Sequence, residues 1–147
     1  MDNFNLDKYE VIKLDNQLCF SFYAISREII KLYKPILDKF NLTYTQYVTM
    51  LVLFEEEEIT FKKLGQRLHL DSGTLTPVIK KLQSMNLLTK ERTKEDDRVV
   101  MVKITDKGRL LKENIIEVPK NLSCKLNITE EEYLELKHMI DNVLEKL

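Results

Sequence analysis

Few of the residues from which catalytic and metal sites are built occur in this chain of 147 residues. It contains two cysteines, two histidines and three glycines, with neither a Cys-x-x-Cys pair nor a glycine-rich phosphate loop. His69 and His138 lack the acidic and cysteine neighbours of a metal site, so we read both as structural and expect neither a metal ion nor a cofactor. No histidine and acid constellation for nucleophilic catalysis is evident. These absences argue against an enzyme.

Long hydrophobic runs are missing as well. The longest apolar stretches are short and the N-terminus is polar, so the sequence predicts neither a signal peptide nor a membrane-spanning helix. Two cysteines without local partners, in a chain without a secretory signal, are typical of the reducing cytosol. We therefore expect a cytoplasmic protein with no membrane partner. Its 44% content of hydrophobic residues is enough for the core of one domain.

An excess of charge of one sign is also lacking, since Lys and Arg number 23 and Asp and Glu 24. The two signs are nevertheless separated along the chain. Residues 62–109 hold 12 basic and 6 acidic residues, a balance of +6, whereas the remainder has a balance of −7. A basic module inside an acidic body is what a DNA-binding protein needs if only one of its surfaces is to meet phosphate.

Between residues 60 and 108 the hydrophobic pattern changes from a helical period to a strand period. Two short helices come first, and the apolar positions of the second recur at steps of three and four: Leu75, Val78, Ile79, Leu82 and Met85. Alternation over 99–104 then predicts a strand, with 88–92 as its hairpin partner. Helix, turn, helix and basic hairpin is the order of a winged helix-turn-helix. A small α+β domain with merely solvated charges is the alternative.

The exposed face predicted for the second helix suits the major groove of DNA. Small hydroxyl residues occupy its first turns and cations follow: Ser72, Thr74, Thr76, Lys80 and Lys81. Hydroxyls can meet base edges or phosphates, and lysines neutralise phosphates. The hairpin carries further cations at and near its tip, within reach of the backbone or the minor groove: Lys90, Arg92, Lys94 and Arg98.

Long amphipathic segments lie on both sides of this module. Helical patterns from 7 to 40 and from 129 to 147 have broader apolar stripes than one small core requires. We expect both to pack against a second copy of the chain, as the two-fold symmetry of DNA half-sites favours. The expected fold is mainly α with a small β-hairpin wing, in a single domain. Its parts are 43–105 for the winged helix-turn-helix, and 7–42 and 106–147 for the dimerisation helices.

Local signals predict where the helices start and stop. N-caps or capping boxes are expected at Thr43 with Gln46, Thr60, Asp71 or Ser72, Thr105, and Thr129 with Glu132. The long N-terminal helix should be kinked or divided at Pro35. Pro119 should end or bend a later helix, which leaves 121–128 as a loop that holds Cys124. The acidic run at 55–58 is read as a solvated turn.

The chain resembles the MarR family of dimeric bacterial repressors in three stretches: LDSGTLTPVIKKL at 70–82, ERTKEDDRVV at 91–100 and ITDKG at 104–108. The organic-hydroperoxide-sensing branch of that family, OhrR, is similar over 13–47, which reads KLDNQLCFSFYAISREIIKLYKPILDKFNLTYTQY. The resemblance runs through Gly108 and fades after about Lys112. It implies a repressor that releases its operator when a peroxide oxidises one cysteine.

The resemblance also implies roles for individual residues of the sensor. The sensing thiol falls on Cys19, and the hydroxyls that activate it, supplied by the other subunit, fall on Tyr33 and Tyr44. Cys124 matches the position of the resolving cysteine in two-cysteine members of the branch. There the sulfenic acid formed on Cys19 would condense with Cys124 of the partner subunit.

For DNA the resemblance implies contacts from the recognition helix and from the wing. The recognition-helix positions are Ser72, Thr74 and Thr76, and the wing positions are Asp96 and Arg98. The residue before the wing is often Arg in the family. Here it is Lys90, which keeps the charge and loses the bidentate fork.

The chemistry of a thiol supports the role of Cys19 independently. A thiol reacts as its thiolate, and a free cysteine with a pKa of ~8.5 is mostly protonated in the cytosol. Tyrosine hydroxyls that donate to the sulfur favour the charged form. Phe20, Phe22 and Tyr23 would add an apolar wall suited to alkyl or lipid peroxides. The alternatives are a small core residue at Cys19, packing roles for the tyrosines and an inert Cys124.

Three functions remain open at this point. The first is a homodimeric repressor of double-stranded operator DNA with an organic hydroperoxide as inducer. The second is a MarR-type regulator that responds to a small aromatic ligand without cysteine chemistry. The third is a thiol peroxidase acting through Cys19, which the absence of a catalytic constellation disfavours.

Overall fold

The computed structural model describes residues 8–93, 96 and 98–147. Seven α-helices, three short 3₁₀ helices and three strands occur in this part of the chain. In order they are η1 (Glu10–Ile12), η2 (Leu14–Asn16), α1 (Leu18–Leu37), η3 (Asp38–Phe40), α2 (Tyr44–Glu56), β1 (Glu58–Thr60), α3 (Phe61–Leu68), α4 (Ser72–Ser84), β2 (Leu88–Arg92), β3 (Val100–Ile104), α5 (Asp106–Ile115), α6 (Glu117–Leu126) and α7 (Glu130–Leu144).

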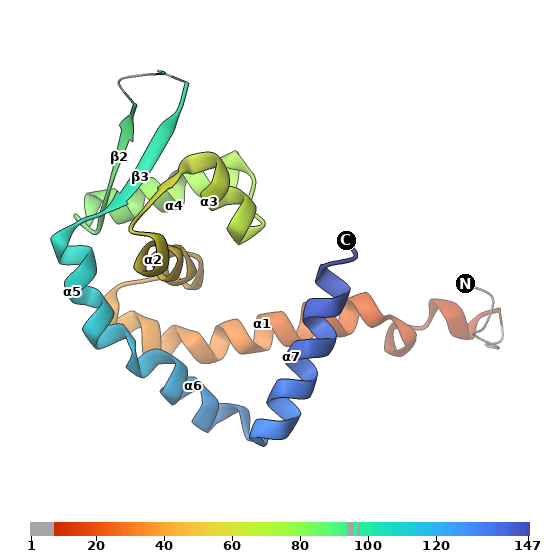
Figure 1. The fold of residues 1–147 in the computed structure, drawn as a ribbon. Coiled ribbons are helices and arrows are strands. Elements are labelled where there is room, and N and C mark those ends of the chain that lie inside the picture. Colours follow the sequence, from red (N-terminus) through yellow and green to blue (C-terminus); the bar gives the residue numbers. More distant parts are fainter. Residues whose placement is uncertain (1–7, 94–95, 97) are drawn as a thin grey trace.

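The α2–β3 part forms a winged helix-turn-helix, as predicted. Helix α2 lies between α1 on one side and the α3–α4 pair on the other, and the β2–β3 hairpin projects beyond them (Figure 1). The sheet is antiparallel with the strand order β1-β3-β2, so β3 is central. Fully buried side chains of α2, α3, α4 and the sheet make one core, among them Leu53, Leu64, Ile79 and Val102.

The predicted caps are confirmed. Capping boxes open α2 at Thr43 with Gln46 and α7 at Thr129 with Glu132. The side chains of Thr60, Asp71 and Thr105 accept backbone N–H groups at the starts of α3, α4 and α5. Each cap satisfies a donor that the first helical turn leaves without an internal partner.

The N-terminal helix is shorter than predicted. It begins at Leu18, and two 3₁₀ turns take the place of a helix from residue 7. The Gln17 side-chain amide donates to the carbonyls of Val11 (2.6 Å) and Lys13 (3.0 Å), so these carbonyls are bonded outside any α-helical ladder. Helix α1 continues through Pro35 to Leu37 without division. No helix in the described part of the chain has both the length and the apolar character to cross a membrane.

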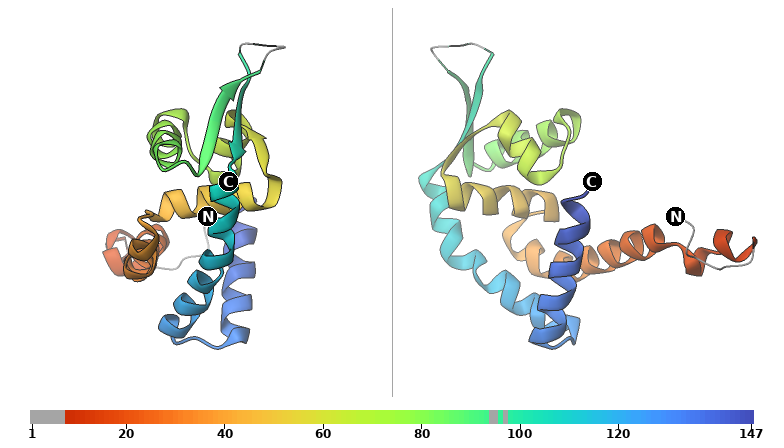
Figure 2. Two further views of the ribbon diagram at one scale, coloured as in Figure 1. Left: turned by 90° about the vertical axis from the view of Figure 1, so that its left-hand side faces the viewer. Right: turned by 45° about the vertical axis from the view of Figure 1, so that its right-hand side comes forward.

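The loop predicted for 121–128 is wrong, because α6 spans Glu117–Leu126 and includes Cys124. Pro119 is the third residue of this helix, where the backbone nitrogen needs no intrahelical partner, so proline is tolerated there. Helices α5, α6 and α7 follow one another, and α6 packs on α1 (Figures 1 and 2). The N-terminal half of α1 extends past α6 and away from the rest of the molecule.

The acidic residues 55–58 are exposed, as predicted, but the turn is confined to Glu57. Glu55 and Glu56 complete α2, and Glu58 opens β1, a strand that the sequence pattern did not reveal. Strand β1 pairs with β3, with Ile59 opposite Val102. The sheet therefore has three strands where a two-stranded wing was expected.

Candidate functional site

Helix α4 presents the polar face predicted for a recognition helix. Ser72, Thr74 and Thr76 are exposed on one side, while Leu75, Ile79 and Leu82 anchor the other side in the core. The two threonine hydroxyls already donate within the helix start: Thr74 Oγ1 to Asp71 Oδ2 (3.2 Å) and Thr76 Oγ1 to the Ser72 carbonyl (2.6 Å). Their outward lone pairs are acceptors, which match amino groups of bases better than phosphates.

Asp71 fixes the beginning of this helix. Its Oδ1 accepts the backbone N–H of Thr74 at 2.8 Å, and these bonds from Thr74 hold the pKa of the Asp71 carboxyl below its usual value. At the other end of α4, Lys80 and Lys81 are exposed and form no ion pair with any described residue. The helix thus combines hydroxyls at its start with free cations toward its end, as the sequence predicts for contact with DNA.

The cations predicted for the wing lie in two different environments. Lys90 is half-buried opposite Val102, and its Nζ lies 4.5 Å from the centroid of the Phe61 ring, so it stacks at the base of the hairpin. Arg92 and Arg98 are exposed toward the tip. The Asp96 carboxylate accepts the backbone N–H of Arg98 at 2.9 Å, which shapes the turn. Lys94 lies outside the described residues.

The acidic run at 55–58 neutralises basic residues of the module, a role that the sequence reading missed. Its ion pairs reach three other elements: Glu55 and Glu56 to Arg67, Glu57 to Arg109, and Glu58 to Lys103. The hydrogen bond and the charge of Arg109 lower the pKa of Glu57. The +6 balance of this region therefore includes cations that hold α3, β3 and α5 together and are not available to DNA.

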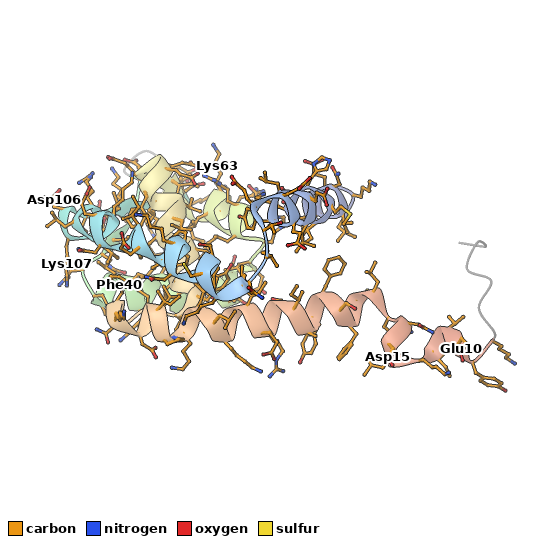
Figure 3. All side chains as sticks on the ribbon, turned by 90° about the horizontal axis from the view of Figure 1, so that it is seen from below. Glu10, Asp15, Phe40, Lys63, Asp106 and Lys107 are labelled. Atoms are coloured by element: carbon orange, nitrogen blue, oxygen red, sulfur yellow. The ribbon has the colours of Figure 1, made fainter. Side chains whose placement is uncertain are left out.

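Cys19 is the second residue of α1 and is exposed. The N-terminal part of this helix extends away from the rest of the molecule (Figure 3). Phe20 and Tyr23 are exposed beside it, with ring centroids 6.3 Å apart, and Phe22 is half-buried. The Tyr23 hydroxyl accepts a hydrogen bond from Arg27 Nη1 at 2.6 Å. Phe20 and Tyr23 lie close together on one side of the helix, whereas Phe22 points to another side. The apolar wall for a peroxide stays a prediction.

Tyr33 and Tyr44 come together in a separate place. Their ring centroids are 4.9 Å apart, and the buried Tyr47 completes a cluster of three. Burial raises the pKa of Tyr33 and of Tyr44, and for Tyr33 the neighbouring tyrosines, including Tyr133 of α7, add to the effect. The hydroxyls therefore stay protonated at neutral pH and can act as hydrogen-bond donors.

Tyr33 forms a wall between two hollows. One, of about 270 Å³, is shared with Tyr44 and has Lys31 and Lys34 among its lining residues. The other, of about 490 Å³, lies against α6 and α7 and includes Ser123 and Tyr133. An incoming side chain or ligand can thus reach the Tyr33 ring from two sides.

The two halves of the predicted sensor do not meet within one chain. Cys19 and Tyr33 are 14 residues apart in one helix, which places them roughly 21 Å apart at a rise of ~1.5 Å per residue. Cys124 is exposed on α6, next to Ser123, which lines the larger hollow beside Tyr33. Both cysteines are free thiols. Within one chain, therefore, Cys19 does not reach the tyrosines.

Comparison with known proteins relates the chain to transcriptional regulators. A family described as transcriptional regulator SarA/Rot matches residues 31–115. The organic hydroperoxide resistance transcriptional regulator of Bacillus subtilis (strain 168) is 45% identical over 141 residues, which are 96% of each chain. Reduced AbfR bound to DNA superposes with a TM-score of 0.81 at 34% identity, over 95% of this chain and 96% of that one. Disulfide-formed AbfR, a protein of Staphylococcus epidermidis, superposes with a TM-score of 0.66 at 34% identity, over 93% and 96%.

Proposed function

This chain belongs to the MarR and SarA group of winged-helix transcriptional regulators, in the organic hydroperoxide resistance branch, and we propose that it is a homodimeric repressor whose Cys19 senses organic hydroperoxides. Oxidation of that thiol releases the operator. The observation that carries the proposal is the separation of the exposed Cys19 from Tyr33 and Tyr44 along one chain. Two copies related by a two-fold axis would complete two equivalent sites.

The apolar surface of the chain supports the dimer. Helix α7 has no buried residue, and the seam predicted from its sequence is exposed or half-exposed along its whole length: Tyr133, Leu136, Ile140 and Val143. The N-terminal half of α1 is equally bare, with Leu18, Tyr23 and Ile25 exposed. Apolar faces of this length are stable in water when a second chain covers them.

In the proposed reaction, the thiolate of Cys19 attacks the terminal oxygen of the hydroperoxide. The O–O bond breaks, the alkoxide takes a proton and leaves as an alcohol, and the sulfur keeps the hydroxyl as a sulfenic acid. Tyr33 and Tyr44 of the partner subunit donate hydrogen bonds that favour the thiolate before the attack. Phe20, Phe22 and Tyr23 give the organic group of the peroxide an apolar surface.

Cys124 completes the sequence as the resolving thiol. Cys124 of the partner subunit attacks the sulfenic sulfur, water leaves, and a disulfide joins the chains. A disulfide requires Cα atoms within ~7 Å. Because successive helical side chains point about 100° apart, the position of Ser123 at the hollow directs Cys124 elsewhere. If Cys19 of the partner subunit enters this hollow, the last turn of α6 has to rotate or unwind to bring Cys124 to it, and α5 connects that turn to the wing.

A gel-shift titration tests this function. The probe is the duplex that the reduced protein selects from a randomised pool, and the oxidants are cumene hydroperoxide and hydrogen peroxide. We expect cumene hydroperoxide to release the wild-type protein but not Cys19→Ser. Non-reducing gels should show a covalent dimer that is lost in Cys19→Ser and in Cys124→Ser.

Two outcomes would replace the proposal with one of the other readings. Peroxide release that is equal in wild type and Cys19→Ser, or no release at all, favours a regulator that responds to a small aromatic ligand. Consumption of many equivalents of peroxide per thiol in the presence of a reductant favours a thiol peroxidase. A wild type that is released but remains monomeric on the gel removes Cys124 from the mechanism and leaves Cys19.

A further inference from the structure

A hollow between helix α3 and the wing brings Lys62 and Lys63, to which the sequence pattern gave no role, together with Arg98 of the wing. It has a volume of about 470 Å³ and is lined by Lys62, Lys63 and Gln66 of α3, by Arg98 and Val100 of the wing, and by Phe61. We call it the α3–wing notch. Helix α3 packs against β3, so the two walls are held in a fixed relation (Figure 2). Lys63 projects outward on the side of the molecule away from α1 (Figure 3).

The cations of the notch differ from the other basic residues of α3 and its neighbours. Lys62, Lys63 and Arg98 form no ion pair with any described residue. Arg67, one turn further along α3, is held by Glu55 and Glu56. Within the described part of the chain, no acidic residue lines the notch. The fold therefore neutralises Arg67 and leaves the three notch cations for an anion from outside.

The location of the notch identifies the anion. Phe61 and Gln66 line both the notch and a second, larger hollow of about 770 Å³. That second hollow extends to Asp71 and Ser72 at the start of α4. The exposed ridge of α3 thus connects the wing with the recognition helix. A DNA strand that contacts both elements has to cross this ridge, because the first helix of a helix-turn-helix spans the backbone beside the groove.

We propose that the α3–wing notch binds one phosphodiester of the operator backbone, with Lys62 and Lys63 from α3 and Arg98 from the wing on the same phosphate. Gln66 adds a neutral donor at the ridge. Contacts of this kind fix the register of the recognition helix without reading sequence. The inference rests on the proposed binding of operator DNA and assigns α3 a part in it that the recognition helix and wing do not perform.

The test measures DNA affinity against salt for Lys62→Gln/Lys63→Gln, with the duplex that the reduced wild type selects. Each neutralised phosphate contributes about 0.9 to the log–log salt slope. In a dimer with two notches the slope should fall by up to about 1.8, and it should reach that value when Arg98→Ala is added, because Arg98 holds the same phosphate. The thermal unfolding temperature should stay unchanged, since both lysines are exposed. Arg67→Gln is the matched control on the same helix, and it should leave the slope unchanged.

Methylphosphonate substitution then locates the contact. Replacing one phosphate per half-site with a neutral methylphosphonate should weaken wild type more than Lys62→Gln/Lys63→Gln, which keeps only Arg98 on that phosphate. Arg98→Ala should lose part of its sensitivity to the same substitution. The notch is excluded if the double variant keeps the wild-type slope, if Arg67→Gln lowers it equally, or if Arg98 and the lysines respond to different phosphates. A wild type that selects no duplex overturns the proposed function instead.

Discussion

The winged module and the terminal helices bury their apolar side chains to different extents. Of 19 exposed large hydrophobic residues among the described ones, 17 lie within 8–30 or 128–147, and none lies between 31 and 109. The core of the module is complete in one chain, and burial of its side chains stabilises it there. The apolar faces of the terminal helices are left uncovered within one chain. One protomer therefore holds the complete winged module, whereas the sensor that we propose would require two.

A cavity in the module should have the largest effect on stability. Leu53 of α2 is fully buried at the centre of the core. Leu53→Ala should lower the free energy of unfolding by about 2–5 kcal/mol, because the removed atoms leave a cavity that the packed helices fill only in part. Chemical denaturation followed by circular dichroism measures it.

The control for this change is Leu110→Ala. Leu110 is 70% exposed on α5, outside the terminal segments. Its truncation should alter the free energy of unfolding by less than about 0.5 kcal/mol. Equal losses in the two variants would mean that the module has no single core.

Charges introduced on α7 should abolish the dimer and leave the winged module folded. Leu136→Glu with Val143→Glu places two carboxylates on the exposed apolar seam, seven residues apart. We expect a monomer by sedimentation equilibrium, because burying unpaired carboxylates at an interface is costly, and we expect the circular dichroism of the helices to be retained. Asn142→Glu adds a charge to a different face of the same helix and should leave the dimer intact. A dimer that survives both seam charges places the interface elsewhere.

Arg98→Ala should weaken DNA binding without touching the sensor. The cation lies near the tip of the wing, where it reaches phosphates or a narrow minor groove. The salt slope should fall by about 0.9 for each lost phosphate contact, while the rate of Cys19 alkylation stays at the wild-type value. An unchanged affinity and slope in a salt titration would remove the wing from the DNA-binding surface.

The double change Tyr33→Phe with Tyr44→Phe should slow the reaction of Cys19 without weakening DNA binding. Fold and DNA affinity are expected to stay near wild type, since both rings are kept. Alkylation of Cys19 by iodoacetamide at neutral pH should slow by about tenfold, because the thiolate loses the stabilisation of about one charge-assisted hydrogen bond. Tyr47→Phe is the control, because Tyr47 is buried beside the pair and is absent from the hollow that they share. If wild type, Tyr33→Phe/Tyr44→Phe and Tyr47→Phe are alkylated at the same rate, Tyr33 and Tyr44 serve only in packing.

Local signals in the sequence were enough for most of the module. A capping box such as Thr43 with Gln46 acts within one turn, so its residues specify the helix start wherever the helix later packs. The alternation in 100–104 likewise predicted β3, because a strand with one buried face has a period of two. The exposed polar residues of α4 could be named because its buried residues recur every three or four positions, and their contact with DNA stays a prediction.

The features that were missed depend on distant partners or on position within an element. Strand β1 is three residues long and exists because Ile59 pairs with Val102 on β3. The carboxylates of 55–58 pair with cations 11 to 52 residues away, which no local pattern reveals. The sequence predicts that Pro119 ends or bends a helix, but it lies in the first turn of α6, so Cys124 lies on a helix. Its role as resolving thiol stays a prediction.

The central claim is that each sensor is shared between two chains, and a mixed dimer tests it most directly. One chain carries Cys19→Ser with intact tyrosines, and the other keeps Cys19 but carries Tyr33→Phe and Tyr44→Phe. The dimer is purified through two different tags, and alkylation of its single remaining Cys19 is timed. A shared site leaves this cysteine with the intact tyrosines of the other chain, so it should react at the wild-type rate. A rate as slow as that of the Tyr33→Phe/Tyr44→Phe homodimer would contradict the account.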